Sequence, residues 1–355
     1  MKKLLAIVLT AAMLLAMLCA CAAKPTETAA TDTKATIGIL MPTKEQTIWS
    51  IQGERLTEAF QKAGYATQIE YAEDDSAKQA MQIENMITKG VNVLVIAAVD
   101  CAALTDACEK AKDAGIYVIA DDRLITNTKA VDFYVTFDLV RMGELQGQYI
   151  VDKLDLENQA GPFTLEIFSG SQDDTNAISF YQGAMNKLQP YLDNGKLVVK
   201  PGQSSYTETA IQSWDSSKAQ SRMDNLLSGY YADSHLDAVL VAADCLALGV
   251  ISSLESMGYG TDANPYPIVT GQDAELAAVK NILAGKQSMT AFLDANKLVP
   301  VVDDLVAGKT PASDTTYNNG VFDVPTKTYD PYLIDKDNVN YLVDVGFYTD
   351  AEING

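Results

Sequence analysis

Residues 82–100, QIENMITKGVNVLVIAAVD, contain the unit that the rest of the chain repeats. A helix is expected to end just before Gly90, because glycine is favoured in the left-handed conformation past a helix end. The run VNVLVIA at 91–97 is almost continuously apolar, which is typical of a strand buried on both faces of a parallel sheet. Gly64 and Gly115 lie 26 and 25 residues from Gly90. That interval is the length of one helix–strand unit.

The same alternation of strands and helices runs through the chain from Thr36 onward. A helix near 47–63 places Gly53, Leu56 and Phe60 on one face, at the helical period. Strands are expected at TIGIL (36–40), IYVIA (116–120), FTLEIF (163–168), KLVVK (196–200), AVLVAA (238–243) and PIVTG (267–271), with helices near 175–189, 217–232, 246–257 and 274–284. This pattern predicts an α/β protein with two similar lobes, whose parallel sheets are covered on both faces.

The composition is that of an acidic globular protein. Hydrophobic residues make up 48% of the 355 residues and charged residues 21%, which fits two domains with full-sized cores and excludes a disordered chain, a collagen or a disulfide scaffold. The 26 Lys and Arg face 47 Asp and Glu, for a net charge of -21. Such a surface repels nucleic acid and anionic lipid, so we expect no nucleic-acid partner.

The N-terminus has the features of a secretory signal. Lys2 and Lys3 precede the apolar run LLAIVLTAAMLLAMLCA at 4–20. The segment Leu18 to Cys21 resembles the bacterial lipobox, so we predict a lipoprotein signal peptide at 1–20 and lipidation of Cys21. An uncleaved membrane anchor is the alternative, but the run is short for a span. Residues 21–35 are expected to form a flexible tether, leaving the lipid as the membrane contact of an extracytoplasmic protein.

The remaining cysteines carry no recognisable pairing. We expect Cys101 and Cys108 on one helix, about 10 Å apart in rise and too far for a disulfide. Cys245 has no partner nearby in sequence. We interpret all three as small buried hydrophobic residues.

Polar side chains follow nearly every predicted strand, at the sheet edge where parallel sheets bind ligands. They are Thr43, Lys44 and Trp49 after the first strand, then Asp100, then Asp121, Asp122 and Arg123, then Asp173, Asp174 and Asn176, then Asp244, and finally Gln272 and Asp273. Helix capping explains any single Asp or Asn, but neither Arg123 nor Trp49. Hydrogen-bond acceptors, one forked donor and aromatic faces together suit a neutral polyhydroxylated ring.

Six motifs then carry a resemblance. The chain resembles the xylose-binding and multiple-sugar-binding proteins of bacterial uptake systems, of the type I periplasmic binding protein family, from about Thr36 to the C-terminus. The motifs are QIENM (82–86), VIADDRLI (118–125), GSQDDTNA (170–177), RMDNLLS (222–228), GQDAE (271–275) and NNGVFDVP (318–325). The resemblance implies two Rossmann-like lobes with parallel sheets joined by a three-segment hinge, a monosaccharide in the cleft and delivery to an ABC transporter permease. In some relatives the partner is a chemoreceptor or sensor kinase.

The resemblance also implies the lobe boundaries. The N-terminal lobe would comprise 36–138 plus 294–327, and the C-terminal lobe 139–293 plus 328–355. The hinge crossings would fall near Asp138, near Leu293 and within 325–330.

Eight sugar-binding residues follow by position from the resemblance. Trp49 and Trp214 would sandwich the ring, although core packing is the ordinary role of a tryptophan. The polar partners would be Asp122 and Arg123 from the first lobe, with Asp174, Asn176, Asp244 and Asp273 from the second. No cofactor, metal or catalytic residue is implied, and we expect a monomer.

Three positions depart from the relatives' pattern. Ile48 and Leu293 stand where relatives carry cations or other polar groups, and Ala243 replaces an Asn or Tyr. A buried hydroxyl left without a partner costs about 1–3 kcal/mol. We therefore hypothesise a deoxy or otherwise less polar sugar, or an altered anomer, unless Lys44 or Asp294 compensates. The candidate ligands are aldoses such as xylose, glucose, galactose and arabinose.

Two other classes of protein fit the sequence less well. A glycosidase could use Asp173 and Asp174, but neighbours in sequence need not have the required separation across a bond. His235 is the only histidine, which disfavours a Ser-His-Asp triad. A repressor with the same lobes would need a DNA-binding N-terminus, where this chain has an export signal. The tail acids Asp335 and Asp337 lack the rest of a calcium loop.

Overall fold

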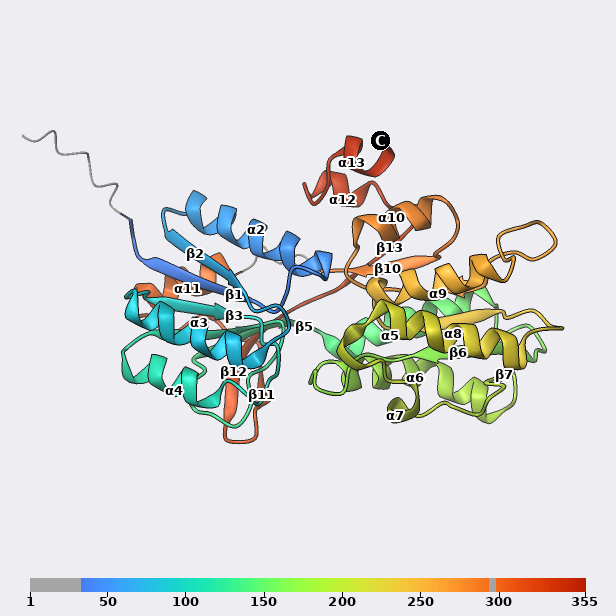
Figure 1. The fold of residues 1–355 in the computed structure, drawn as a ribbon, viewed down its shortest axis with the longest axis horizontal. Coiled ribbons are helices and arrows are strands. Elements are labelled where there is room, and N and C mark those ends of the chain that lie inside the picture. Colours follow the sequence, from blue (N-terminus) through green and yellow to red (C-terminus); the bar gives the residue numbers. More distant parts are fainter. Residues whose placement is uncertain (1–32, 294–297) are drawn as a thin grey trace, which may run out of the picture. The chain divides into compact units, whose positions relative to one another are not determined.

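The first sheet has seven strands in the order β11-β12-β5-β4-β3-β1-β2 (Figure 1). All neighbouring pairs are parallel except β11–β12. The strands are β1 (Thr36–Met41), β2 (Ala66–Tyr71), β3 (Val93–Ile96), β4 (Tyr117–Asp121), β5 (Phe133–Phe137), β11 (Thr315–Asn318) and β12 (Asp323–Tyr329). This is a computed structural model that describes residues 33–293 and 298–355. The predicted signal peptide, Cys21 and most of the tether lie outside the described residues, as does Asp294.

Helices cover both faces of this sheet because successive strand residues point to opposite sides. Ile39 packs with Phe60 of α2 and Val302 of α11, whereas Leu40 packs with α3 and α4 on the other face. Full burial of each such side chain contributes roughly 1.5–3 kcal/mol. The helices are α2 (Thr47–Lys62), α3 (Ser76–Thr88), α4 (Thr105–Asp113) and α11 (Val299–Val306).

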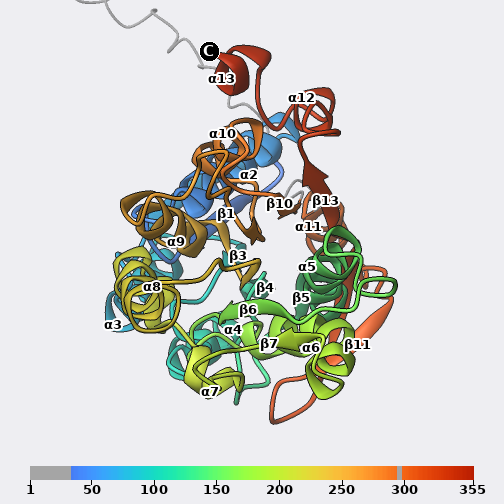
Figure 2. The ribbon, with the colours of Figure 1, turned by 90° about the vertical axis from the view of Figure 1, so that its right-hand side faces the viewer.

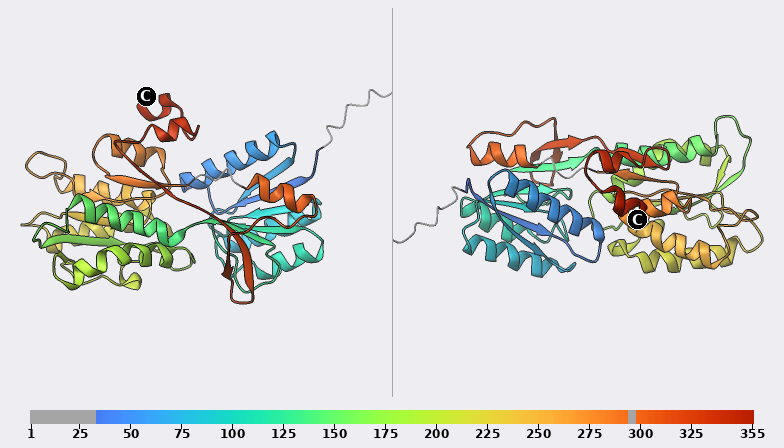
Figure 3. Two further views of the ribbon diagram at one scale, coloured as in Figure 1. Left: turned by 180° about the vertical axis from the view of Figure 1, so that it is seen from behind. Right: turned by 90° about the horizontal axis from the view of Figure 1, so that it is seen from above.

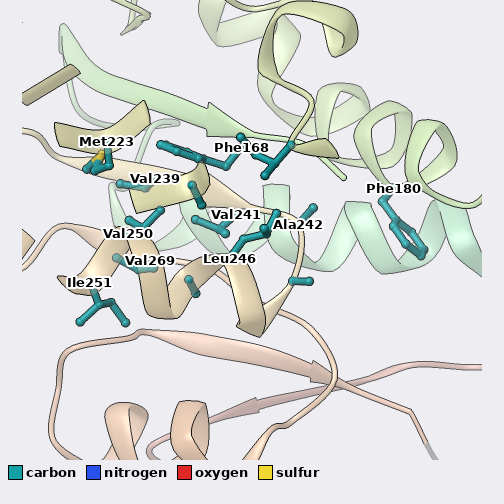
Figure 4. Packing of buried hydrophobic residues seen from close by; sticks show 14 of the residues in the cluster. Phe168, Phe180, Met223, Val239, Val241, Ala242, Leu246, Val250, Ile251 and Val269 are labelled. Carbon is teal, nitrogen blue, oxygen red and sulfur yellow. The ribbon is translucent and has the colours of Figure 1, made fainter. Parts of the chain in front are cut away.

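The second lobe repeats the arrangement with a parallel sheet in the order β7-β6-β8-β9. Helices α8 and α9 pack on one side of it, and α5 and α6 on the other (Figure 2). Figure 4 shows Val239 and Val241 of β8 against Leu246 and Val250 of α9. The elements are β6 (Phe163–Phe168), β7 (Leu197–Val198), β8 (Ala238–Val241) and β9 (Ile268–Val269), with α5 (Leu139–Lys153), α6 (Ala177–Asp193), α7 (Tyr206–Thr209), the 3-10 helix η1 (Gln212–Trp214), α8 (Ser216–Tyr230), α9 (Asp244–Ser256) and α10 (Leu276–Leu283).

The C-terminal part of the chain, from about residue 289 onward, contributes strands to both lobes (Figure 3). β12 pairs with β5 of the first sheet, while β10 (Met289–Phe292) pairs antiparallel with β13 (Tyr332–Asp335). Two short helices follow, α12 (Tyr341–Asp344) and α13 (Asp350–Asn354). Since β12 continues to Tyr329, we propose the predicted lobe division with its last boundary moved to about residue 330.

Two glycines let α5 and α6 approach closely. A Cβ at Gly143 of α5 would overlap the carbonyl of Phe180, and one at Gly183 of α6 would overlap the carbonyl of Val140. Backbone-to-backbone packing of this kind leaves α6 little freedom to shift. The first turn of α6 is therefore held in a fixed place, and that turn contributes to the site below.

Local structure follows the sequence patterns at the helix ends, but the predicted strands at 196–200 and 267–271 are only two residues long and Cys245 is only partly buried. Gly64, Gly90 and Gly115 all have positive φ, as predicted for helix ends. The prediction that Cys101 shares a helix with Cys108 is wrong, because α4 begins only at Thr105. The Asp100 carboxylate accepts a hydrogen bond from the backbone N–H of Ala102, and this turn competes with helix.

Candidate functional site

A cavity lies where the carboxyl ends of both parallel sheets meet. Its empty volume of about 670 Å³, which includes the part open to solvent, falls in the range of small-molecule sites. Seven of the eight predicted sugar-binding residues line it. They are Trp49, Asp122, Arg123, Asp174, Asn176, Trp214 and Asp273.

Arg123 is the buried centre of the polar wall. Its Nε lies 3.1 Å from Oδ2 of Asp174, and Nη1 donates to the carbonyl of Ala98 at 2.9 Å. The guanidinium also lies over the Trp49 ring, 4.9 Å from the centroid. Such a group can donate hydrogen bonds in fixed directions while stacking on an aromatic face.

Asp122 and Asn176 form a second contact between the lobes. The Asn176 side-chain amide donates to the carbonyl and to Oδ1 of Asp122, at 2.9 and 3.1 Å. Burial raises the pKa of Asp122 to about 7, with a further contribution from the charge of Asp174. Burial likewise raises the pKa of Asp273 to about 7, aided by the charge of Glu275. A neutral ligand that donates hydroxyl hydrogens to these carboxylates would stabilise their ionised form.

Site residues share an uncommon backbone conformation. Asp122, Trp214 and Asp273 have φ of 63°, 52° and 98°. Non-glycine residues in this region cost of order 1–3 kcal/mol each and collect at functional sites, where the surrounding structure holds them. At these three positions, the surrounding structure therefore holds the backbone in place beside the cavity.

The two tryptophans come from different lobes. Trp49, on α2, is 5% exposed and donates from its indole N–H to Oε1 of Gln46 at 3.1 Å. Trp214, in η1, is 8% exposed and packs directly against Gly170. Its indole nitrogen is buried and makes no hydrogen bond within the described residues.

Asp244 does not line the cavity, and its prediction as a sugar contact is not supported by this placement. Its fully buried carboxylate accepts hydrogen bonds from Gln287, Thr290 and the backbone N–H of Glu275. These three partners are all in the region from α10 to β10, so Asp244 fixes that region to the start of α9. Its neighbours Ala243 and Cys245 line the cavity instead.

The cavity also contains residues that the sequence did not single out as a site. Phe137 and Phe180 lie at a strand end and inside a helix, where their sequence context is that of core residues. Gln52 and Arg55 add polar groups from α2. Phe347 comes from the C-terminal tail, by which we mean residues 336–355 after β13. The three departures from the relatives' pattern, Ile48, Ala243 and Leu293, all line the cavity.

The described parts of the chain contain neither a membrane-spanning helix nor a metal cluster. Across 33–293 and 298–355, no helix is both long enough and apolar enough to cross a membrane. In the same ranges, no group of three or more His, Cys, Asp or Glu residues could hold a metal ion.

Two α/β lobes that both contribute hydrogen-bonding and aromatic groups to one cavity define a bilobal ligand-binding protein. Residues 37–309 match the family model described as a periplasmic binding protein domain, and the chain belongs to this family. The fold is that of a type I periplasmic binding protein, as predicted.

Three similar proteins illustrate the relationship. The chain is 50% identical over 322 residues to the multiple sugar-binding periplasmic receptor ChvE of Rhizobium radiobacter, covering 89% of this chain and 91% of the relative. It is 33% identical over 310 residues to the D-xylose-binding periplasmic protein of Escherichia coli, covering 86% and 88%. An ABC transporter solute binding protein from Clostridium phytofermentans, solved with β-D-glucose, has a TM-score of 0.85 at 43% identity, covering 90% of this chain and 99% of that one.

Proposed function

We propose that this protein captures a neutral monosaccharide in the cavity between its lobes and delivers it to the permease of an ABC transporter. The observation that carries the proposal is the joint placement of Trp49, Trp214 and the Arg123–Asp174 pair around one cavity. Aromatic faces pack against the apolar faces of a sugar ring, and the charged groups bind its hydroxyls. Relatives named for sugar binding, and a structure solved with glucose, support the same ligand class.

The cycle requires no chemical step. Ligand contacts to both lobes favour the closed form, because a ligand shifts a conformational equilibrium by its differential affinity for the two states. The closed form presents a different outer surface from the open one, and a membrane partner can distinguish them. We place the protein outside the cytoplasmic membrane, as its periplasmic relatives are, and propose lipidation of Cys21 as its anchor.

A sensory role is the second candidate. The 50% identical relative is named a receptor, and the same closed form could be presented to a chemoreceptor or sensor kinase. A glycosidase fits the geometry less well. Asp174 is paired with Arg123, while Asp173 accepts hydrogen bonds from Ser171 and Gln212. These two acids hold the loop rather than facing each other across a bond.

Calorimetric titration with glucose, xylose, galactose and arabinose tests the proposal. We expect one sugar bound per chain and no turnover during prolonged incubation. Conversion of a sugar or glycoside by the protein alone would favour the enzyme. To separate delivery from sensing, the protein is reconstituted with its transporter, where delivery predicts sugar-dependent stimulation of ATP hydrolysis.

A further inference from the structure

Arg55 joins α2 of the first lobe to the C-terminal tail. Its Nη1 donates to the carbonyl of Gly346 at 3.3 Å, and its Nη2 donates to the carbonyl of Phe347. The guanidinium carbon lies 4.2 Å from the centroid of the Phe347 ring. Both Arg55 and Phe347 line the cavity, so this contact forms part of its wall.

The tail itself is fixed to the second lobe. The Phe347 ring meets Phe292 of β10 edge to face, with centroids 4.6 Å apart. The next residue, Tyr348, is 7% exposed and donates its hydroxyl to the carbonyl of Ala274 at 3.0 Å. All four residues belong to one buried cluster, so the tail is packed as a part of the second lobe although it lies far away in sequence.

The Arg55 contact therefore crosses between the lobes at a point separate from the Arg123–Asp174 pair. Ile51, one helical turn before Arg55, packs against the same tail cluster and extends the contact. Opening the lobes would remove the guanidinium from both carbonyls and from the ring. The contact thus favours the form in which the lobes meet, and it does so without using the Arg123–Asp174 pair.

We propose that Arg55 is a positioning residue for ligand capture. It binds the C-terminal tail at Gly346 and Phe347, a contact that we call the clasp, and this contact slows release of the bound sugar. The proposal rests on the proposed function, since it concerns how the sugar is retained. Arg55 acts by holding the closed form, so replacing it should lower the affinity for every sugar by the same factor. A residue that contacts the sugar directly would instead change the order of preference among sugars.

The test uses Arg55→Ala and Phe347→Leu, singly and together, in the full mature chain. Lys62→Ala is the matched control, because Lys62 is an exposed cation at the end of the same helix. Calorimetry and stopped-flow tryptophan fluorescence give affinity and dissociation rate for the four sugars. We expect Arg55→Ala to release sugar roughly five- to tenfold faster, with the order of preference unchanged. Phe347→Leu removes only the ring contact and leaves both backbone carbonyls for Arg55, so its effect should be smaller. The double variant should be little worse than Arg55→Ala, because the ring contact is already lost without the guanidinium.

Small-angle X-ray scattering supplies a readout that does not need a bound sugar. Arg55→Ala should have a larger radius of gyration than the wild type in the same buffer, while Lys62→Ala should match the wild type. An unchanged dissociation rate, an altered sugar order or unchanged scattering would overturn the clasp. Failure of the wild type to bind any sugar would count against the proposed function. The comparison of radii of gyration would still test whether the Arg55 contact holds the lobes together.

Discussion

Nε of Arg123 lies 3.1 Å from Oδ2 of Asp174, and this buried ion pair joins the end of β4 to the loop that precedes α6. The side chains are only 8% and 5% exposed. Removing one partner of such a pair leaves the other charge buried without compensation, which is far more costly than the net value of the pair. The pair is therefore both part of the proposed sugar site and a contact between the two lobes.

We predict that Arg123→Ala abolishes sugar binding and lowers the free energy of unfolding by about 3 kcal/mol. Asp122→Ala should also abolish the sugar-induced change in fluorescence, with a smaller loss of stability because it breaks no ion pair. Calorimetry and denaturant titration measure both effects. Arg141→Ala is the control, since Arg141 is 49% exposed and its contact with Glu144 contributes about 1 kcal/mol at most. Unchanged affinity in both site variants would remove Arg123 and Asp122 from the site.

The fluorescence signal should come from the cavity itself. Trp49 and Trp214 are the only tryptophans of the protein, and both line the cavity. We expect Trp49→Phe and Trp214→Phe each to keep a sugar-induced change from the remaining indole, with affinity reduced about tenfold by the smaller ring. A signal that survives intact in one variant and vanishes in the other would show that only one ring meets the sugar.

Stability without ligand should fall as pH rises from about 4 to about 8. Burial is the main cause that raises the pKa of Asp121 to about 8, and the charge of Asp122 adds to it. Burial also raises the pKa values of Asp122 and Asp273 to about 7. In this window the folded protein binds more protons than the unfolded chain, so each group contributes up to about 1.4 kcal/mol of loss per pH unit. The stabilisation from these three carboxyl groups is fully present only below about pH 4, the usual pKa of an Asp side chain in the unfolded chain.

Thermal unfolding between pH 5 and pH 8 measures this dependence. Asp121→Asn should flatten the slope, because its neutral side chain keeps the acceptor for the Gln52 amide without a titrating group. Asp215→Asn is the matched control, since a hydrogen bond from Ser217 lowers the pKa of Asp215 and its contribution is lost only in more acidic solution. A wild-type slope in Asp121→Asn would show that Asp121 does not titrate in this window.

Much of the fold and of the polar wall could be predicted because both depend on local sequence. Apolar runs such as 91–97 mark buried strands, and the glycines after helices mark the ends of the units. The polar residues after each strand meet at one edge of a parallel sheet, and for this reason the sequence alone groups Asp122, Arg123 and Asp174 in one site.

Other parts of the site depend on contacts that no local pattern encodes. The Arg55–Phe347 contact joins residues 292 positions apart and exists only once the tail has docked. Asp244 follows a strand just as a ligand-binding acid does, yet Gln287 and Thr290 from a later segment surround its carboxylate. The positive φ of Trp214 is likewise imposed by surrounding structure rather than by residue type.

The apolar positions Ile48, Ala243 and Leu293 should restrict which sugars bind. All three line the cavity and offer no side-chain hydrogen bond, so a hydroxyl directed at them would lose about 1–3 kcal/mol, or roughly 5- to 150-fold in affinity. We expect calorimetry to separate the four aldoses, with deoxy or otherwise less polar sugars, or a single anomer, favoured. Leu293→Lys should relax this preference. Equally tight binding of all four sugars by the wild type would refute altered specificity.

Gly170 should set the position of Trp214. A Cβ at residue 170 would overlap the six-membered part of the indole, so Gly170→Ala must displace the ring from its place in the cavity wall. We expect at least a tenfold loss of sugar affinity, with stability lowered by about 1–3 kcal/mol from overpacking. Gly229→Ala is the matched control, because nothing lies within 4 Å of its Cβ position in α8 and alanine favours helix there. Calorimetry and denaturant titration of the two variants decide the matter: wild-type affinity in Gly170→Ala would mean that Trp214 is not held against the sugar by this contact.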